Sequence, residues 1–181
     1  MSNPTDTTTA TTDAIRRAVD RARTAMTRMD SVGRGTARTR ARIEEGLTCR
    51  VEDGRWSFTV DMPEKAGGGA HGPDPGVFGR TGLASCLAVG YAMWAAHEGV
   101  PVASVEVEVE ADYDARPEYG LGEKPPGYDA LRWTVRIESS APDEAIDRVL
   151  AITEERSPWL ALIRDPRELH RTVELRRPEG G

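Results

Sequence analysis

The sequence predicts one α+β domain with a basic helix in front of it. Three observations indicate this: short alternating segments flank residues 75–98, those residues form one long apolar helix, and two helices follow. A chain of 181 residues with 38% hydrophobic and 30% charged residues can bury one core. We expect a disordered tail over residues 1–12, a helix over 13–35 and the domain over 36–181.

The N-terminal helix is predicted to be amphipathic. Apolar side chains recur at helical spacing, at Ile15, Val19, Ala22, Met26 and Met29. Arginines occupy much of the remaining surface, and residues 1–50 carry a net charge of +4. We expect this helix to pack on the domain or on a partner subunit. The alternative is that it binds an acidic partner or a membrane surface.

Three short strands are predicted before the long helix. Segments 36–45 and 47–52 alternate weakly, and the Asp53-Gly54 pair that follows is typical of a hairpin turn. Residues 56–60 alternate clearly, with one apolar face. Residues 63–75 are rich in glycine and proline and are expected to form a loop.

The long helix is predicted over residues 75–98. Pro75 suits its first turn, and Gly99 followed by Pro101 is a normal C-terminal signal. Because the helix is apolar on nearly all sides, we expect it to be central and covered around its girth. Its uncharged run, residues 81–96, is shorter than the roughly 20 residues that a membrane span needs.

Two strands and two helices should follow. Valines alternate with glutamates over residues 105–112, and apolar residues alternate with arginines over residues 131–138. Antiparallel pairing would place Arg132 and Arg136 opposite the glutamates. A helix should begin near Pro142 and a second at Ser157-Pro158, with a last strand over 169–175.

Composition excludes several functional classes. A net charge of −6 argues against general nucleic-acid binding, and two cysteines cannot form a disulfide framework. Three widely separated histidines give no metal-ligand spacing. The segment from Gly67 to Gly72 lacks the Lys-Ser/Thr of a phosphate loop, so we expect a flexible connection. With no export signal visible, we expect a reducing, cytoplasmic setting.

Cys86 is the residue of most chemical interest. It lies inside the predicted long helix, where one interpretation is a small, buried, unreactive thiol. The other is a thiolate that faces a pocket and is stabilised by a cation or by hydrogen bonds. The helix start is about eleven residues away, too far for its dipole to act, so a partner must come from elsewhere in the fold.

The chain resembles the OsmC/Ohr family of thiol-dependent hydroperoxide reductases from about Thr36 to Leu175. The resemblance rests on an ordered set of motifs: Asp61-Met62-Pro63, Gly67-Gly68, Gly72-Pro73-Asp74-Pro75, Leu83-Ala84-Ser85-Cys86-Leu87-Ala88, Gly99-Val100 and Ser157-Pro158. It implies an α+β fold in which antiparallel sheets wrap around a long central helix and a second helix. It also implies an intertwined homodimer with active sites at the interface.

The resemblance implies roles for individual residues. Cys86 takes the peroxidatic position, whereas Ser157 stands where the family has its resolving cysteine and Gly76 where it has a glutamate. The resemblance aligns the family's arginine most nearly with Glu44, with Arg42 or Arg40 as nearby substitutes, and we take Arg42 as the thiolate partner. Serine cannot form a disulfide, so oxidised Cys86 would need an external thiol, or Cys49, to reduce it.

Two functions therefore remain open. The first is a hydroperoxide reductase that uses Cys86 and an external thiol, with Tyr91 and Trp94 as apolar residues that favour organic peroxides. The second is a family member that no longer turns over and binds a small apolar ligand or a partner in the same interfacial pocket. Neither function requires a cofactor or a metal, and neither involves nucleic acid or a membrane.

Overall fold

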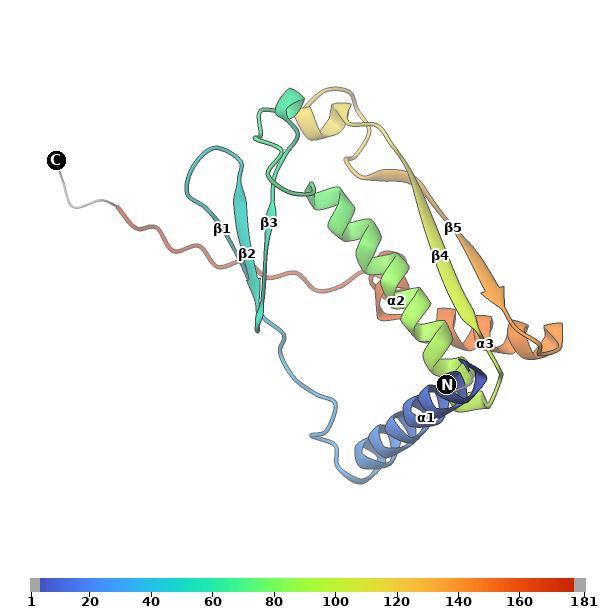
Figure 1. The fold of residues 1–181 in the computed structure, drawn as a ribbon. Coiled ribbons are helices and arrows are strands. Elements are labelled where there is room, and N and C mark those ends of the chain that lie inside the picture. Colours follow the sequence, from blue (N-terminus) through green and yellow to red (C-terminus); the bar gives the residue numbers. More distant parts are fainter. Residues whose placement is uncertain (1–3, 178–181) are drawn as a thin grey trace.

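The fold is α+β with antiparallel sheets. The computed structural model describes residues 4–177, and the side chains of residues 11–177. Its helices and strands are α1 (Pro4–Arg28), β1 (Thr39–Ile43), β2 (Cys49–Asp53), β3 (Trp56–Val60), η1 (Glu64–Ala66), α2 (Pro75–Glu98), β4 (Ser104–Tyr113), η2 (Arg116–Tyr119), β5 (Tyr128–Glu138), α3 (Asp143–Arg156) and α4 (Pro158–Arg164). Figure 1 shows α2 at the centre, between the sheet β1-β2-β3 and the hairpin β4-β5.

The central helix α2 has the predicted bounds. The Asp74 carboxylate accepts a hydrogen bond from the Val77 N–H at 3.1 Å and caps the start. Gly99, with φ +71°, ends the helix in the left-handed conformation. The core forms where Leu83, Leu87 and Tyr91 pack beneath β4, β5 and α4, with at most 1% of each residue exposed.

One side of α2 is exposed to solvent. Thr81, Ser85 and Val89, which are four residues apart, are exposed, and Val89 is 67% exposed. The expectation that α2 is covered around its girth is therefore wrong for a single chain. The β4-β5 hairpin covers one side, α3 with α4 another and α1 the C-terminal half, and within the described part of the chain Thr81, Ser85 and Val89 stay exposed.

The β4-β5 hairpin has the predicted antiparallel register. Glu106 lies opposite Arg136 and Glu110 opposite Arg132. The Arg136 guanidinium bridges Glu106 at 2.9 Å and Glu108 at 2.8 Å on the exposed face. The alternate apolar side chains turn inward onto α2. The opposite charges thus pair across the outer face while the inner face supplies the core.

Helix α1 packs along the C-terminal half of α2. It extends from Pro4 to Arg28, so it begins inside the segment expected to be a tail, while residues 1–3 lie outside the described residues. The Trp94 ring has the guanidinium of Arg23 (5.7 Å) and that of Arg156 (5.6 Å) against it. His97 Nδ1 lies 2.9 Å from an Asp20 carboxylate oxygen. These contacts favour packing of this helix on the domain.

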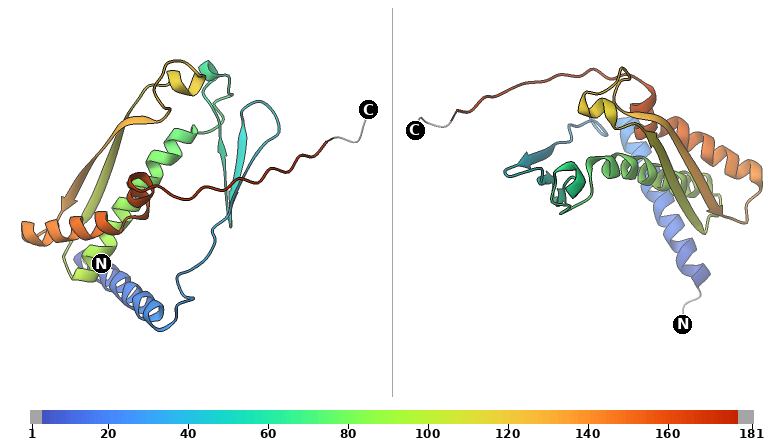
Figure 2. Two further views of the ribbon diagram at one scale, coloured as in Figure 1. Left: turned by 180° about the vertical axis from the view of Figure 1, so that it is seen from behind. Right: turned by 90° about the horizontal axis from the view of Figure 1, so that it is seen from above.

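Residues 166–177, which follow α4, are extended and form no strand. The strand predicted over residues 169–175 is therefore wrong for the single chain: Leu169 is 90% exposed and Leu175 is 82% exposed. Two further views show this segment running away from the helices (Figure 2). A strand needs a hydrogen-bonded neighbour, and within the described residues none lies beside this segment.

Candidate functional site

Cys86 lies on a face of α2 that is lined with glycine. Gly82 and Gly90, one turn before and after it, both touch residues of the α3–α4 region. A β-carbon built at Gly90 would lie 2.7 Å from the Thr153 methyl carbon, and one built at Gly82 would lie 2.5 Å from the Trp159 ring. The absence of side chains at these two positions lets the α3–α4 junction come close to the backbone of α2 and brings it against Cys86.

Ser157 is the immediate partner of Cys86. Cys86 Sγ lies 3.5 Å from Ser157 Oγ, and Ser157 is only 4% exposed. Ser157 also caps α4, because its oxygen accepts a hydrogen bond from the Leu160 N–H at 3.3 Å. Either atom of the Cys86–Ser157 pair can be the donor, so the Ser157 hydroxyl can donate to the sulfur while its oxygen accepts from Leu160.

Both cysteines are free, and they lie on different elements. Cys86 is half-buried and sits next to the exposed Ser85 on α2. Cys49 is half-buried on β2, where its sulfur is 3.9 Å from the Arg50 carbonyl oxygen. Among the described residues, Ser157 is the side chain that contacts the Cys86 sulfur by a hydrogen bond.

Side chains of other residues surround Gly76 at the start of α2. The Tyr128 hydroxyl donates to the Gly76 carbonyl oxygen at 3.4 Å and accepts from the Arg80 guanidinium at 3.1 Å. A β-carbon at Gly76 would lie 3.1 Å from that guanidinium and 3.3 Å from the hydroxyl. The Asp74 carboxylate lies nearest, at 3.0 Å, so the place where the resemblance expects a glutamate is bordered by an aspartate, an arginine and a tyrosine.

Arg42 does not meet Cys86 within the described part of the chain. It is exposed on β1, paired with Glu44 at 3.0 Å. It lines an open cavity of about 1040 Å³ together with Phe58 and His71, and Cys86 is not part of that lining.

Tyr91 and Trp94 belong to the packing of α2. The fully buried Tyr91 donates its hydroxyl to Glu154 at 2.9 Å, and burial, together with that carboxylate, raises its pKa above the usual value. Trp94 is eight residues beyond Cys86, about 12 Å along the helix, and faces α1 and α3. The structure therefore brings Ser157 to Cys86 and leaves Tyr91 and Trp94 as core and helix-docking residues.

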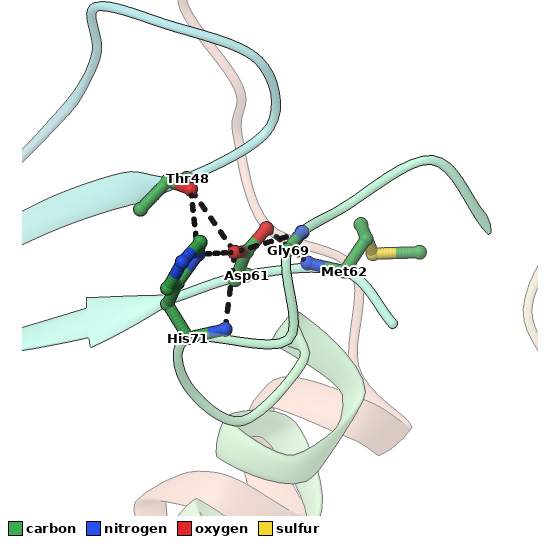
Figure 3. Close-up of polar contacts among 5 residues, drawn as sticks. All are labelled: Thr48, Asp61, Met62, Gly69 and His71. Atoms are coloured by element: carbon green, nitrogen blue, oxygen red, sulfur yellow. Dashed lines mark hydrogen bonds and ion pairs between the residues drawn. The ribbon is translucent and has the colours of Figure 1, made fainter. Parts of the chain in front are cut away.

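A second polar cluster, centred on Asp61, was not anticipated from the sequence (Figure 3). One carboxylate oxygen of this buried residue accepts from His71 Nδ1 (2.8 Å), the His71 N–H (3.2 Å), the Thr48 hydroxyl (3.0 Å) and the Gly69 N–H (3.1 Å). The other accepts from the Met62 N–H at 2.8 Å. Burial alone would raise the pKa of Asp61, but hydrogen bonds from His71, Thr48 and Met62 lower it well below its usual value.

This cluster explains the glycine-rich loop. The loop folds around the Asp61 carboxylate so tightly that a β-carbon at Gly68 would lie 1.9 Å from the Met62 carbonyl oxygen. A β-carbon at Gly72 would lie 2.3 Å from the Thr59 carbonyl oxygen. The loop therefore holds a carboxylate of its own chain. The only signal in the sequence is an aspartate that ends a strand just before the glycine run.

The described residues contain no group of three or more His, Cys, Asp or Glu side chains placed to hold a metal ion. Within the same residues, no helix is both long enough and apolar enough to cross a membrane.

A family model described as OsmC-like protein matches residues 67–169, more than half of the chain. The chain belongs to this family. The match begins in the glycine-rich loop and includes α2 with Cys86 and the α3–α4 junction with Ser157. It leaves α1 and β1 to β3 outside.

Solved structures are similar in fold. An OsmC-like protein from Mycoplasma pneumoniae has a TM-score of 0.61 at 17% identity, covering 72% of this chain and 88% of that one. An organic hydroperoxide resistance protein from Legionella pneumophila has a TM-score of 0.52 at 22% identity, covering 72% and 90%. No curated protein matches the chain.

Proposed function

We propose that this protein reduces organic hydroperoxides, with Cys86 as the reacting thiol and a thiol outside the chain as the reductant. The contact between Cys86 Sγ and the buried Ser157 hydroxyl carries the proposal, because it places a polar hydrogen-bonding group directly against the thiol that takes the family's peroxidatic position. Membership of the OsmC-like family and the fold shared with an organic hydroperoxide resistance protein support it.

The first step oxidises the sulfur. The Cys86 thiolate attacks the terminal oxygen of the hydroperoxide, so that an S–O bond forms and the O–O bond breaks. The electron pair leaves with the alkoxide, which takes up a proton and departs as an alcohol. Cys86 is then a sulfenic acid, oxidised by two electrons.

Reduction of the sulfenic acid requires two thiols from outside. Ser157 has no sulfur with which to form a disulfide. One external thiol therefore attacks the sulfenic sulfur, which releases water and leaves a mixed disulfide on Cys86. A second external thiol attacks the outer sulfur of that bond, which returns Cys86 to the thiol and releases the disulfide of the reductant. The reducing cytoplasm is the setting that supplies such thiols.

A homodimer is part of this proposal. The exposed side of α2 at Ser85 and Val89 lies beside Cys86, and the unpaired segment after α4 exposes Leu169, Val173 and Leu175. Trp56, 63% exposed on β3, adds apolar surface on the other sheet. A second copy would cover these surfaces and bring an arginine from its own β1, with Arg42 the candidate, toward the sulfur.

A second function, binding without turnover, is favoured by a specific observation. Gly76 has no side chain to supply the carboxylate that the family has at this position, the nearest side-chain atoms being those of Asp74, Arg80 and Tyr128, and Ser157 cannot resolve an oxidised thiol. In this case the same pocket would hold a small apolar ligand or a partner protein. A ligand that stays bound through purification and is identified by mass spectrometry, in a protein that consumes no peroxide, would support this second function.

Peroxide consumption tests the first function. Cumene hydroperoxide loss is followed with dithiothreitol as reductant for the wild type, Cys86→Ser and Cys49→Ser. Cys49 is the matched control because it is the other free thiol, also half-buried. We expect Cys86→Ser to lose consumption and Cys49→Ser to keep it. Equal consumption by the wild type and Cys86→Ser would reject the reductase.

A further inference from the structure

The Trp159 ring lies against the backbone of α2 one turn before Cys86. A β-carbon built at Gly82 would be 2.5 Å from ring carbon Cζ2 of Trp159 and 2.7 Å from Cε2. Gly82 and Cys86 are four residues apart, so they share one face of the helix about 6 Å apart. The glycine is what allows the indole to come this close to the helix.

The Cys86 side chain leans toward that ring. In an α-helix each Cα–Cβ bond tilts toward the N-terminus, so a side chain covers the turn before its own residue. The turn before Cys86 is the one at Gly82, against which Trp159 lies. Ser157, two residues before Trp159, holds the sulfur at 3.5 Å. The α3–α4 region thus places a hydroxyl at the sulfur and an indole against the turn of α2 toward which the sulfur leans.

The helix surface on the N-terminal side of Gly82 is open at Gly79. Gly79, nearly one turn before Gly82 on the same face, has no heavy atom of another element within 4 Å of where its β-carbon would be. Trp159 itself is 36% exposed. A molecule that approaches the sulfur from the Gly82 side of this face meets the indole of Trp159 first.

We propose that Trp159 determines which molecules reach the Cys86 sulfur, by forming an apolar cover that admits small reagents and holds back bulky ones. The proposal rests on the reductase function above, for which Trp159 would set the choice among hydroperoxides. Trp159 acts on access and contact, and the chemistry of the sulfur remains with Cys86 and Ser157.

Alkylation of the thiol tests the cover without requiring peroxide turnover. In a Cys49→Ser background, the rate of Cys86 modification is measured by mass spectrometry with iodoacetamide and with a fluorescein maleimide. We expect Trp159→Ala to speed the bulky reagent about tenfold and the small one less than about twofold. Gly82→Ala, whose new methyl pushes the ring away, should shift the ratio of the two rates in the same direction.

Two further variants provide controls. Leu162→Ala removes another exposed apolar side chain of α4 and should leave both rates unchanged. Trp159→Phe keeps an aromatic ring, so the selectivity should largely remain. In the parent protein we expect alkylation of Cys86 to change the tryptophan emission. Trp159→Phe should remove that change, which would assign the contact to Trp159 among the four tryptophans of the chain.

The outcomes separate this proposal from the reductase. Equal acceleration of both reagents in Trp159→Ala, or none, would overturn the role of Trp159 even if the wild type consumes peroxide. Loss of the size selectivity in Trp159→Ala supports the role of Trp159 as a cover. If the selectivity is lost in Trp159→Ala but the wild type consumes no peroxide, the reductase function is rejected and the role of Trp159 stands. If the wild type does consume peroxide, the ratio of the rates with cumene hydroperoxide and hydrogen peroxide should rise in Trp159→Ala.

Discussion

Two glycines of α2 should respond in opposite ways to the same substitution. Gly79 and Gly90 both lie inside the helix, so replacing either with alanine should yield about 1 kcal/mol of helix stability. At Gly79 the methyl group meets open space. At Gly90 it would lie 2.7 Å from the methyl carbon of Thr153, which is buried and β-branched and therefore stiff.

The magnitude follows from this difference. Overpacking at a rigid site costs about 2 kcal/mol, so Gly90→Ala should be destabilising by about 1 kcal/mol after the helix gain. Gly79→Ala should be stabilising by about 1 kcal/mol. For a chain of this length each change corresponds to about 3 °C in melting temperature, in opposite directions. Thermal and urea unfolding followed by circular dichroism measure both quantities.

A rescue experiment isolates the contact. Thr153→Ser removes the methyl group that the new alanine would strike, so the double variant Gly90→Ala/Thr153→Ser should recover the stability that Gly90→Ala loses relative to Thr153→Ser. Equal effects of alanine at Gly79 and Gly90, or a double variant with no recovery, would refute the close approach of α3 to α2 as described.

Three further variants test other parts of the structure. Asp61→Asn should lower the melting temperature by several degrees at neutral pH. Because the pKa of Asp61 is depressed in the folded state, the difference in melting temperature between wild type and variant should be constant above about pH 5. It should shrink as pH falls below about 4. Ser157→Cys should lose two thiols on treatment with one equivalent of peroxide and form a disulfide with Cys86, whereas the wild type loses one; unchanged thiol counts in nonreducing mass spectrometry would contradict the 3.5 Å contact. Trp94→Ala should raise amide hydrogen exchange in α1 about tenfold, since two arginines lose their ring; unaltered exchange would place the docking elsewhere.

Local patterns in the sequence predicted most of the elements. The cap at Asp74, Pro75 and the stop at Gly99 determine the bounds of α2 through short-range hydrogen bonds and backbone angles. The charge alternation in β4 and β5 predicted their register, because a one-residue slip would bury the glutamates. These features depend only on residues near one another in the sequence or directly across a hairpin.

Features that depend on contacts between distant segments could not be predicted in this way. The Asp61 cluster joins β3 to the β1–β2 turn and to the glycine-rich loop, and no periodicity signals such a contact. The strand predicted over residues 169–175 has apolar side chains at Leu169, Val173 and Leu175 but no neighbouring strand among the described residues.

The candidate site was predicted in part. Sequence resemblance pointed to Cys86 and Ser157, and the structure brings their side chains together. It gave no sign that Trp159 would lie over Gly82, because that contact depends on how α4 crosses α2. Arg42 stays with Glu44 on β1, and its role as thiolate partner remains a prediction for the dimer.

A single turnover with organic hydroperoxide tests the central claim most directly. The reduced protein is mixed with one equivalent of cumene hydroperoxide in a stopped-flow instrument without reductant, and the alcohol formed and the Cys86 thiol lost are counted together. The account predicts one alcohol for each Cys86 thiol lost, recovery of that thiol on addition of dithiothreitol, and no alcohol from Cys86→Ser. Loss of peroxide while the Cys86 thiol stays intact would contradict it.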